Sequence, residues 1–120
     1  MPHVIKPQDQ ESFYVHENVP ARVVGNGTNM TALMTWWPPD TSFSIHTHPH
    51  EQIGIVIQGQ PIITIDGHDS QAQEGDVYHI PPNVPHTQRN EGPGEVVFFE
   101  CFAPVRADLL RRKFEQKIIS

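Results

Sequence analysis

The sequence has a single cysteine, Cys101, in 120 residues and contains no long apolar run. One cysteine cannot form an intrachain disulfide, which excludes a secreted disulfide scaffold, and we expect Cys101 to be a buried small apolar side chain near Phe99 and Phe102. The longest nearly apolar run, from Ile53 to Ile57, is far too short to cross a bilayer. The N-terminus also lacks the apolar stretch of a signal peptide. We therefore expect a cytoplasmic protein without a membrane segment.

Positive charge is scarce as well. The chain has 8 Lys and Arg against 14 Asp and Glu, a net charge of -6 with His neutral. A nucleic-acid interface needs a clustered basic face, and the only basic group, residues 111–113, fits the solvated face of a helix. We expect no nucleic-acid partner. The length allows one domain, which buries only about two-thirds of its unfolded surface, so we also expect a homodimer.

Turn-forming residues are abundant, with 12 Pro and 8 Gly spread along the chain. This pattern is typical of short strands joined by turns, and Asn26-Gly27 and Asp66-Gly67 suit tight hairpins. Residues 1–20 are interpreted as an N-terminal arm with a strand-like piece at 13–15, 21–104 as an all-β sandwich or barrel, and 105–120 as a C-terminal helix. The expected barrel strands are 22–24, 30–37, 43–48, 52–57, 62–65, 68–73, 77–80 and 95–102. On the helix, the stripe Leu110, Phe114 and Ile118 is expected to pack on the barrel or on a partner subunit.

Three of the eight histidines form a candidate metal site. His46 and His48 stand two apart at the end of an expected strand, so both imidazoles lean from one face. The amide oxygen of Gln52 could supply a further ligand from the next strand. His86 follows a stiff proline-rich turn that can aim it at the same point. Three imidazoles and one oxygen leave coordination positions open for water or substrate. His3, His16 and His68 are interpreted as surface residues or as satisfied core residues.

Neighbouring residues leave two questions at this site. Glu51 directly precedes Gln52, the first residue of the expected strand, so its side chain faces the opposite side of the sheet. Glu51 is therefore a second-choice ligand. His50 is either a residue at the mouth of a cavity or an exposed loop residue. The metal is one divalent ion, and zinc, nickel, manganese, iron and copper all accept imidazole ligands.

One acid lies in an otherwise apolar strand. Alternation puts Phe98, Glu100 and Phe102 on one strand face. Burial would raise the pKa of the Glu100 carboxyl toward neutrality, which suits a general acid or base, whereas a nearby cation would lower that pKa. The alternative is an exposed glutamate balanced by Arg106.

Two motifs resemble those of the cupin superfamily. The first is His46-x-His48-x3-Gln52-x6-Gly59, and the second is Gly75-x5-Pro81-x-Asn83-x2-His86-x3-Asn90. The resemblance implies a jelly roll, or double-stranded β-helix, around the metal site. Asn83 replaces a usual glycine, which is tolerable because Asn adopts the left-handed conformation. Gln52 replaces a usual glutamate, so the protein leaves the charge of the metal uncompensated, which favours an anionic substrate.

A narrower resemblance points to the pectin-degradation cupins that ketonise unsaturated uronic acids. It rests on the run from His46 to Gly54, on Tyr78-x-Ile80-Pro-Pro-Asn-Val-Pro-His86, and on Glu100-x-Phe102-x-Pro104-x-Arg106-x-Asp108. The resemblance implies that His46, His48, Gln52 and His86 hold the metal and that Glu100 moves the proton. The family acid is aspartate, and the extra methylene of Glu100 shifts the carboxyl by about 1 Å.

The leading hypothesis is a metal-dependent enzyme that transfers a proton on a small anionic, sugar-acid-like molecule. Glu100 is the catalytic acid or base, and Arg106 grips a substrate carboxylate. Trp36, Met34, Phe98 and Phe102 are expected to line the barrel beside the substrate, although core packing would explain them equally. The alternatives are a cupin dioxygenase that uses the same metal site and a non-catalytic cupin that binds or senses a small molecule.

Overall fold

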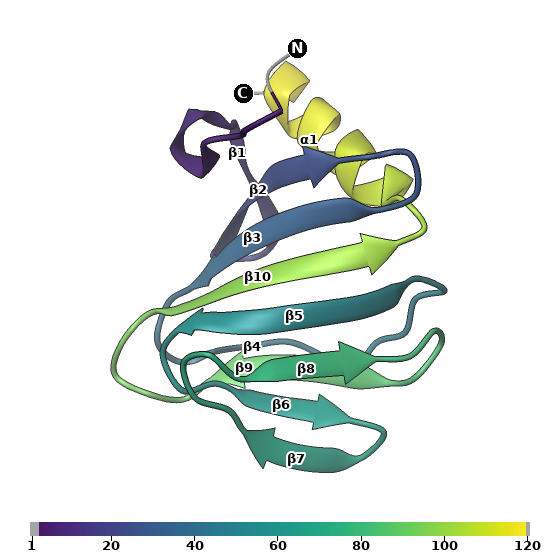
Figure 1. The fold of residues 1–120 in the computed structure, drawn as a ribbon. Helices are drawn as coiled ribbons and strands as arrows, with labels where there is room; N and C mark the ends of the chain where they lie inside the picture. The colour runs from purple at the N-terminus through teal and green to yellow at the C-terminus, as the bar shows by residue number, and fades with distance from the viewer. Residues whose placement is uncertain (1–2, 120) are drawn as a thin grey trace.

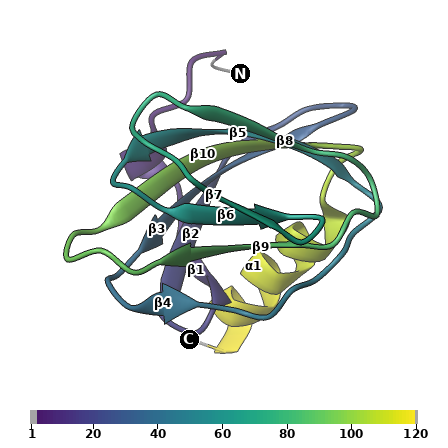
Figure 2. The ribbon, with the colours of Figure 1, turned by 90° about the horizontal axis from the view of Figure 1, so that it is seen from below.

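The protein folds into two antiparallel sheets that face each other as a flattened barrel (Figures 1 and 2). The computed structural model describes residues 3–119, with side chains through residue 116. The strand orders are β1-β2-β3-β10-β5-β8 and β4-β9-β6-β7. The elements are η1 (Pro7–Asp9), β1 (Ser12–His16), β2 (Val19–Asn26), β3 (Thr31–Trp37), β4 (Thr41–Ser42), β5 (Glu51–Gln58), β6 (Ile62–Ile65), β7 (His68–Gln71), β8 (Val77–Ile80), β9 (His86–Asn90), β10 (Val96–Ala103) and α1 (Ala107–Ile119). The all-β jelly roll with one C-terminal helix is confirmed.

The core lies between the sheets and is filled by alternate residues of the strands. Phe13, Val15, Val19, Ala21 and Val23 point inward from β1 and β2, and Phe98 and Phe102 do so from β10. Period-two alternation explains this arrangement, since successive strand residues face opposite sides of a sheet. Among the described residues, no helix is long and apolar enough to cross a membrane.

The hairpin turns form where the sequence indicates them. Asp66 and Gly67 join β6 to β7 with φ angles of 51° and 80°, as a two-residue turn of the mirror-image type requires. At the first hairpin, β2 continues through Asn26, and the loop closes where the Gly27 N–H donates to the Met30 carbonyl at 2.8 Å. That hairpin is confirmed, but its loop lies slightly later than expected.

The strand expected at residues 43–48 is wrong. Regular pairing stops at β4 (Thr41–Ser42), and beyond it only His46 forms an isolated bridge, with His86. One cause is that the Thr87 hydroxyl donates to the Phe43 carbonyl at 2.6 Å, so a side chain takes the place of a ladder bond. The segment crosses from one sheet toward the other and carries His46 and His48 with it.

The N-terminal segment belongs to the sheet more fully than an arm would. Residues 12–20 form β1 and the start of β2, which extend the six-stranded sheet. The Gln116 side chain accepts from the Tyr14 N–H and donates to the Tyr14 carbonyl, both at 2.8 Å. Helix α1 thereby occupies the free edge of β1, which would otherwise expose unpaired backbone groups.

Helix α1 packs on the barrel through only part of its expected apolar stripe. Leu109 is buried, Leu110 is half-buried, and Phe114 is 61% exposed. The side chain of Ile118 lies outside the described residues. Helix α1 is anchored instead through polar groups, because the Arg112 guanidinium donates to the Val15 carbonyl beside the Gln116 contacts.

Candidate metal centre

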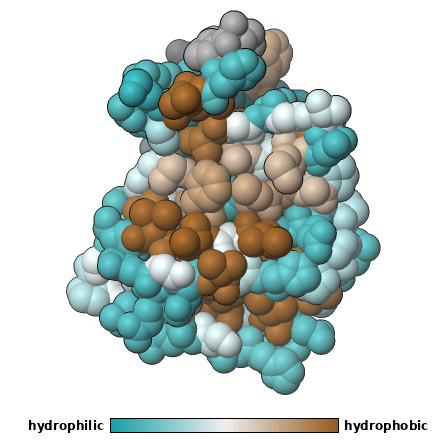
Figure 3. Space-filling view, viewed as in Figure 1, coloured by the Kyte–Doolittle hydropathy of each residue, from teal (hydrophilic) through white to brown (hydrophobic). Residues whose placement is uncertain are grey.

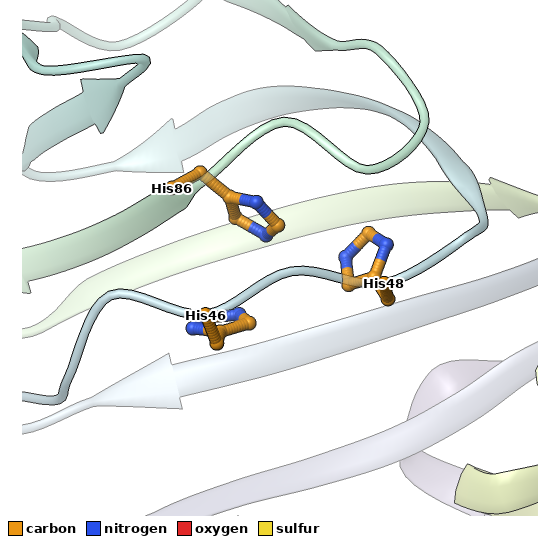
Figure 4. Close-up of side chains that lie close together, drawn as sticks. All are labelled: His46, His48 and His86. Atoms are coloured by element: carbon orange, nitrogen blue, oxygen red, sulfur yellow. The ribbon is translucent and has the colours of Figure 1, made fainter.

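Three histidines meet where the segment after β4 passes the start of β9 (Figure 4). His46, His48 and His86 each offer one nitrogen, and these atoms all lie within 4.8 Å of one another. The backbones of His46 and His86 exchange two N–H···O bonds of 3.0 Å. A third tie is the Asn83 N–H, which donates to the His48 carbonyl at 2.9 Å from a residue with φ of 64°. The two motifs are thus fixed to each other by the backbone.

Each of the three imidazoles is oriented by a backbone carbonyl two residues away. Nδ1 contacts the Ser44 carbonyl in His46 (3.0 Å), the His50 carbonyl in His48 (2.9 Å) and the Val84 carbonyl in His86 (2.9 Å). A carbonyl can only accept, so Nδ1 carries the proton and Nε2 keeps a free lone pair. Burial lowers the pKa of His86 to about 4 and also lowers the pKa of His48. His48 and His86 therefore present neutral imidazoles suited to bind a metal ion.

The side chain of Gln52 adds an oxygen that could bind a cation beside the three histidines. The side chain is buried, and its Oε1 lies 3.1 Å from Nε2 of His48. Because Nδ1 of His48 carries the proton, Nε2 has none to donate. The contact therefore places two lone pairs, one on Nε2 and one on Oε1, next to each other. The other end of the amide donates to the Glu100 carboxylate, which fixes the oxygen toward the histidines. Two acceptors directed at one point fit a divalent ion with mixed nitrogen and oxygen ligands.

Glu100 lies behind Gln52 and is only 3% exposed. The Tyr78 hydroxyl donates to its carboxylate at 2.8 Å, and the Gln88 amide donates at 3.2 Å. Burial raises the pKa of Glu100, although the hydrogen bonds from Tyr78 and Gln88 and the charge of Arg106 partly oppose that rise. The expectation of a buried acid is confirmed, and the alternative of an exposed glutamate balanced by Arg106 is wrong.

The histidines, Gln52 and Glu100 line one cavity of about 280 Å³ between the sheets. Arg106, just before helix α1, and Asp108, Leu109 and Arg112 of that helix contribute to its wall. Arg106 lies 4.6 Å above the Phe102 ring and forms two hydrogen bonds to Asp108, from Nε at 2.9 Å and from Nη2 at 2.8 Å. The cavity therefore joins a candidate metal site, a buried acid and a guanidinium group.

Comparison with known proteins identifies the family. A family model described as the cupin domain matches residues 32–102. The chain is a cupin. It is 38% identical over 66 residues to the H2HPP isomerase of Bacillus subtilis and 32% identical over 97 residues to the HTH-type transcriptional regulator PuuR of Escherichia coli. These matches cover 54% and 78% of this chain, but only 28% and 52% of those proteins. The chain thus spans about half or less of the curated relatives it matches.

Solved structures support the same fold. An RmlC-like cupin from Shewanella frigidimarina has a TM-score of 0.82 at 22% identity, covering 91% of this chain and 96% of its own. KdgF from a Halomonas species has a TM-score of 0.81 at 21% identity, covering 91% and 99%. At this level of identity the likeness shows the fold alone.

Two of the expected cavity residues are not in the cavity of this cupin. On β3, Leu33, Thr35 and Trp37 face inward, and the alternate residues Met34 and Trp36 face outward. The prediction that Met34 and Trp36 line the barrel is therefore wrong. Trp36 lies instead beneath the Arg22 guanidinium, 5.6 Å from its ring centre.

The other expected lining residues lie on the inner face of β10. Phe102 lines the cavity, whereas Phe98 lies deeper and makes edge-to-face contacts with Trp37 and Tyr78. The second-choice ligand Glu51 points outward and pairs with His79 at 2.7 Å. His50 is half-buried at the cavity side, with its ring 5.7 Å from that of His48.

Three residues near the site escaped the sequence analysis. Tyr78 and Gln88 contact Glu100 from β8 and β9. Tyr78 opens one of the quoted motifs but was given no role there, and the only signal for Gln88 is alternation within a short strand. His16, interpreted as a surface or satisfied core residue, is exposed but lines the cavity, and its ring stacks on Phe43 with ring centres 3.5 Å apart. Partial burial, followed by the charges of His46 and Arg112, lowers the pKa of His16 to about 4. No local motif marks His16, because β1 is far from the histidine motifs in sequence.

Replacing Gly54 with alanine should weaken the hydrogen bonds around Glu100. A Cβ on Gly54 would lie 2.3 Å from the Tyr78 ring and hydroxyl, so Tyr78 would have to move. We expect a loss of about 2 kcal/mol in the free energy of unfolding, as for other overpacked cores, measured by urea titration. Gly94→Ala is the control, because its Cβ would meet nothing within 4 Å. Equal stability of the two variants would contradict the tight packing.

Asp108→Asn should lower stability in a pH-dependent way. The Arg106 hydrogen bonds hold the pKa of Asp108 down at about 2, against 3.8 ordinarily. The stabilisation is therefore present above pH 4 and is lost as the pH falls from 4 to 2. Because Asp108 is 57% exposed, we expect about 1 kcal/mol, measured by urea unfolding from pH 3 to 7. A double-mutant cycle with Arg106→Gln isolates the pair, and a pH-independent difference would argue against it.

Proposed function

We propose that this cupin is a metal-dependent enzyme that ketonises a small anionic, sugar-acid-like substrate by proton transfer. One observation carries the proposal: the buried Glu100 carboxyl is joined through the Gln52 amide to the three-histidine cluster. An acid held against a metal site inside one cavity suits proton transfer next to developing negative charge. The narrower resemblance in the sequence and the identity to an isomerase over 66 residues support the same chemistry.

The residues at the cluster would hold one divalent metal ion. His46, His48 and His86 would bind it through Nε2, and Gln52 through Oε1. The bound ion would supply Lewis-acid stabilisation of a substrate oxygen. Because all four ligands are neutral, the protein would leave both positive charges uncompensated, and an anionic substrate would be favoured.

Glu100 would hold and move the proton. Burial favours its protonated form, and the carboxyl proton would form the new C–H bond at the substrate carbon. The electron pair for that bond comes from the carbon–carbon double bond of an enol. The enol O–H proton passes to solvent water as the carbonyl forms, and Glu100 regains a proton from solvent, so the overall reaction moves one proton and consumes no co-reactant. Tyr78 and Gln88 would hold the Glu100 carboxylate in place through this step.

Arg106 would bind the substrate carboxylate at the wall of the cavity. Asp108 engages its Nε and Nη2, which leaves Nη1 to meet an anion. The Phe102 ring lies against the guanidinium and fixes its plane. Phe102 would also shield the reacting carbon from water.

The regulator match supports a second candidate function. The identity to PuuR extends over 97 residues, which favours a non-catalytic module that binds a small anion in the same cavity. Such a module would require the metal cluster and Arg106 but no proton transfer by Glu100. The role of Glu100 therefore separates the two candidates.

The metal site is tested with Zn²⁺ as the probe. We expect isothermal titration of chelator-treated protein to show one Zn²⁺ per chain, and His48→Gln and His86→Gln to weaken binding at least 100-fold, because each removes an oriented Nε2. His68→Gln on β7 is the control, since His68 is exposed and is not a member of the cluster. Unchanged Zn²⁺ affinity in both ligand variants would refute the site.

Glu100→Gln should abolish turnover without loss of metal. The amide cannot deliver the proton, so we expect kcat to fall about 10²- to 10⁴-fold. The assay follows the loss of the ultraviolet absorbance of an unsaturated uronate, and elemental analysis gives the metal content. Glu51→Gln is the matched control because Glu51 points away from the cavity. If the wild type binds the uronate without turnover and Glu100→Gln binds it equally, the binding module is favoured.

A further inference from the structure

The two sides of the six-stranded sheet differ in charge. The outer face is largely apolar (Figure 3), and Cys101, expected to be buried, is half-buried on that side. The cavity on the inner side is lined by two guanidinium groups, Arg106 and Arg112, and by His16 in addition to the histidine cluster. The proposed reaction uses Arg106 but gives no role to Arg112 or His16.

A β-bulge brings His16 to the cavity. Val15 points inward from β1, so strict alternation would turn His16 to the outer side. The pairing of β1 with β2 shifts at this point, because the two steps from Tyr14 to His16 match the single step from Pro20 to Val19. Such a bulge twists the strand and changes the direction of a side chain. It explains how an exposed residue of β1 comes to line the cavity.

The His16 ring is held by stacking. It lies 3.5 Å from the Phe43 ring, and Phe43 in turn stacks on Trp37 at 4.6 Å. Within residues 3–116, no hydrogen bond engages either ring nitrogen of His16. An imidazole carries at least one N–H in both its neutral and its charged form. His16 therefore has a donor that can bind a ligand.

The Arg112 guanidinium is held beside His16. Its Nη1 donates to the carbonyl of Val15, the residue that precedes His16. After burial and the charge of His46, the charge of Arg112 is the third cause that lowers the pKa of His16, which indicates that the two groups are close together. The hydrogen bond to Val15 leaves Nε and Nη2 of Arg112 for a ligand.

The carboxyl groups of the cavity wall do not neutralise Arg112. Asp108 forms two hydrogen bonds to Arg106 and offsets the charge of that guanidinium. The Glu100 carboxyl is held by donors from β5, β8 and β9. In the part of the chain whose side chains are described, no salt bridge joins a carboxylate to Arg112. The cavity therefore has an uncompensated cation besides the charge of any bound metal ion.

The two positions that could bind an anion lie near different histidines of the cluster. Arg106 lies 4.6 Å from the Phe102 ring, which contacts the His48 ring at 5.7 Å. The His16 ring instead lies 6.2 Å from that of His46. A ligand that reaches both positions would therefore lie across the metal site.

We propose that His16 and Arg112 form a second anion subsite and that the substrate is a small dicarboxylate, with one carboxylate at Arg106 and the other at this subsite. The proposal rests on the proposed function, since the reacting carbon would lie over the metal site between the two carboxylates. A cavity of about 280 Å³ is at the small end of ligand sites, so the acid is a short one. Both residues lie outside the segment 32–102 that the family model matches.

Isothermal titration with two non-reacting acids tests the subsite. D-Glucarate carries a carboxylate where D-gluconate carries a terminal hydroxymethyl group. With Zn²⁺-loaded protein freed of unbound metal, we expect glucarate to bind about 10-fold more tightly, as an added hydrogen bond between charged groups gives. Arg112→Gln should abolish this preference and leave gluconate binding unchanged. Arg111→Gln is the matched control, because Arg111 is an exposed neighbour of the same charge that does not line the cavity.

His16→Phe should weaken glucarate binding about 5-fold, because the ring can still stack on Phe43 but has no N–H. Glucarate that binds no more tightly than gluconate, or does not bind, would overturn the subsite. Equal losses for both acids in Arg112→Gln would also overturn it, since Arg112 would then only anchor α1. Neither acid is turned over, so these results leave the reaction at Glu100 standing, and unchanged turnover in Glu100→Gln would leave the subsite standing.

Discussion

The hydrogen bond from the Gln52 amide to the Glu100 carboxylate is the interaction on which the rest of the site depends. An amide has a donor end and an acceptor end, so once the donor end is bound to Glu100 the acceptor end must face His48. A glutamate at position 52 would set two carboxylates against each other, and one would have to take up a proton. Gln52 thus couples a buried acid to a candidate metal site without placing a second negative charge next to Glu100.

This coupling explains why so many polar groups are buried in a small barrel. An unpaired buried carboxylate costs several kcal/mol, and Glu100 is instead held by donors from β5, β8 and β9. Gly54 is part of the same arrangement, because its missing side chain gives the Tyr78 ring the space to reach Glu100. The polar network therefore depends on strand packing at a place where the sequence shows only a short apolar strand.

The histidine cluster and the buried acid were predictable from the sequence because polar residues mark a face of an apolar strand. Glu100 fixes which residues of β10 point inward. On β3 the polar residues mislead, because Thr31 and Thr35 share the inner face with Leu33 and Trp37. Met34 and Trp36 make the outer face the more apolar one, so alternation predicts the wrong inward face for this strand. Tyr78, Gln88 and His16 escaped prediction because strand register, rather than local pattern, brings them to the site.

Strand alternation separates the two faces of the six-stranded sheet. Gln52 and Gly54 face the cavity from β5 while Ile53 and Ile55 face outward, and Glu100 alternates with Phe99 and Cys101 on β10. A slip of one residue would exchange these sets and bury an isoleucine beside the Glu100 carboxylate. Any longer side chain at Gly54 would collide with Tyr78, so the register is held from within the barrel.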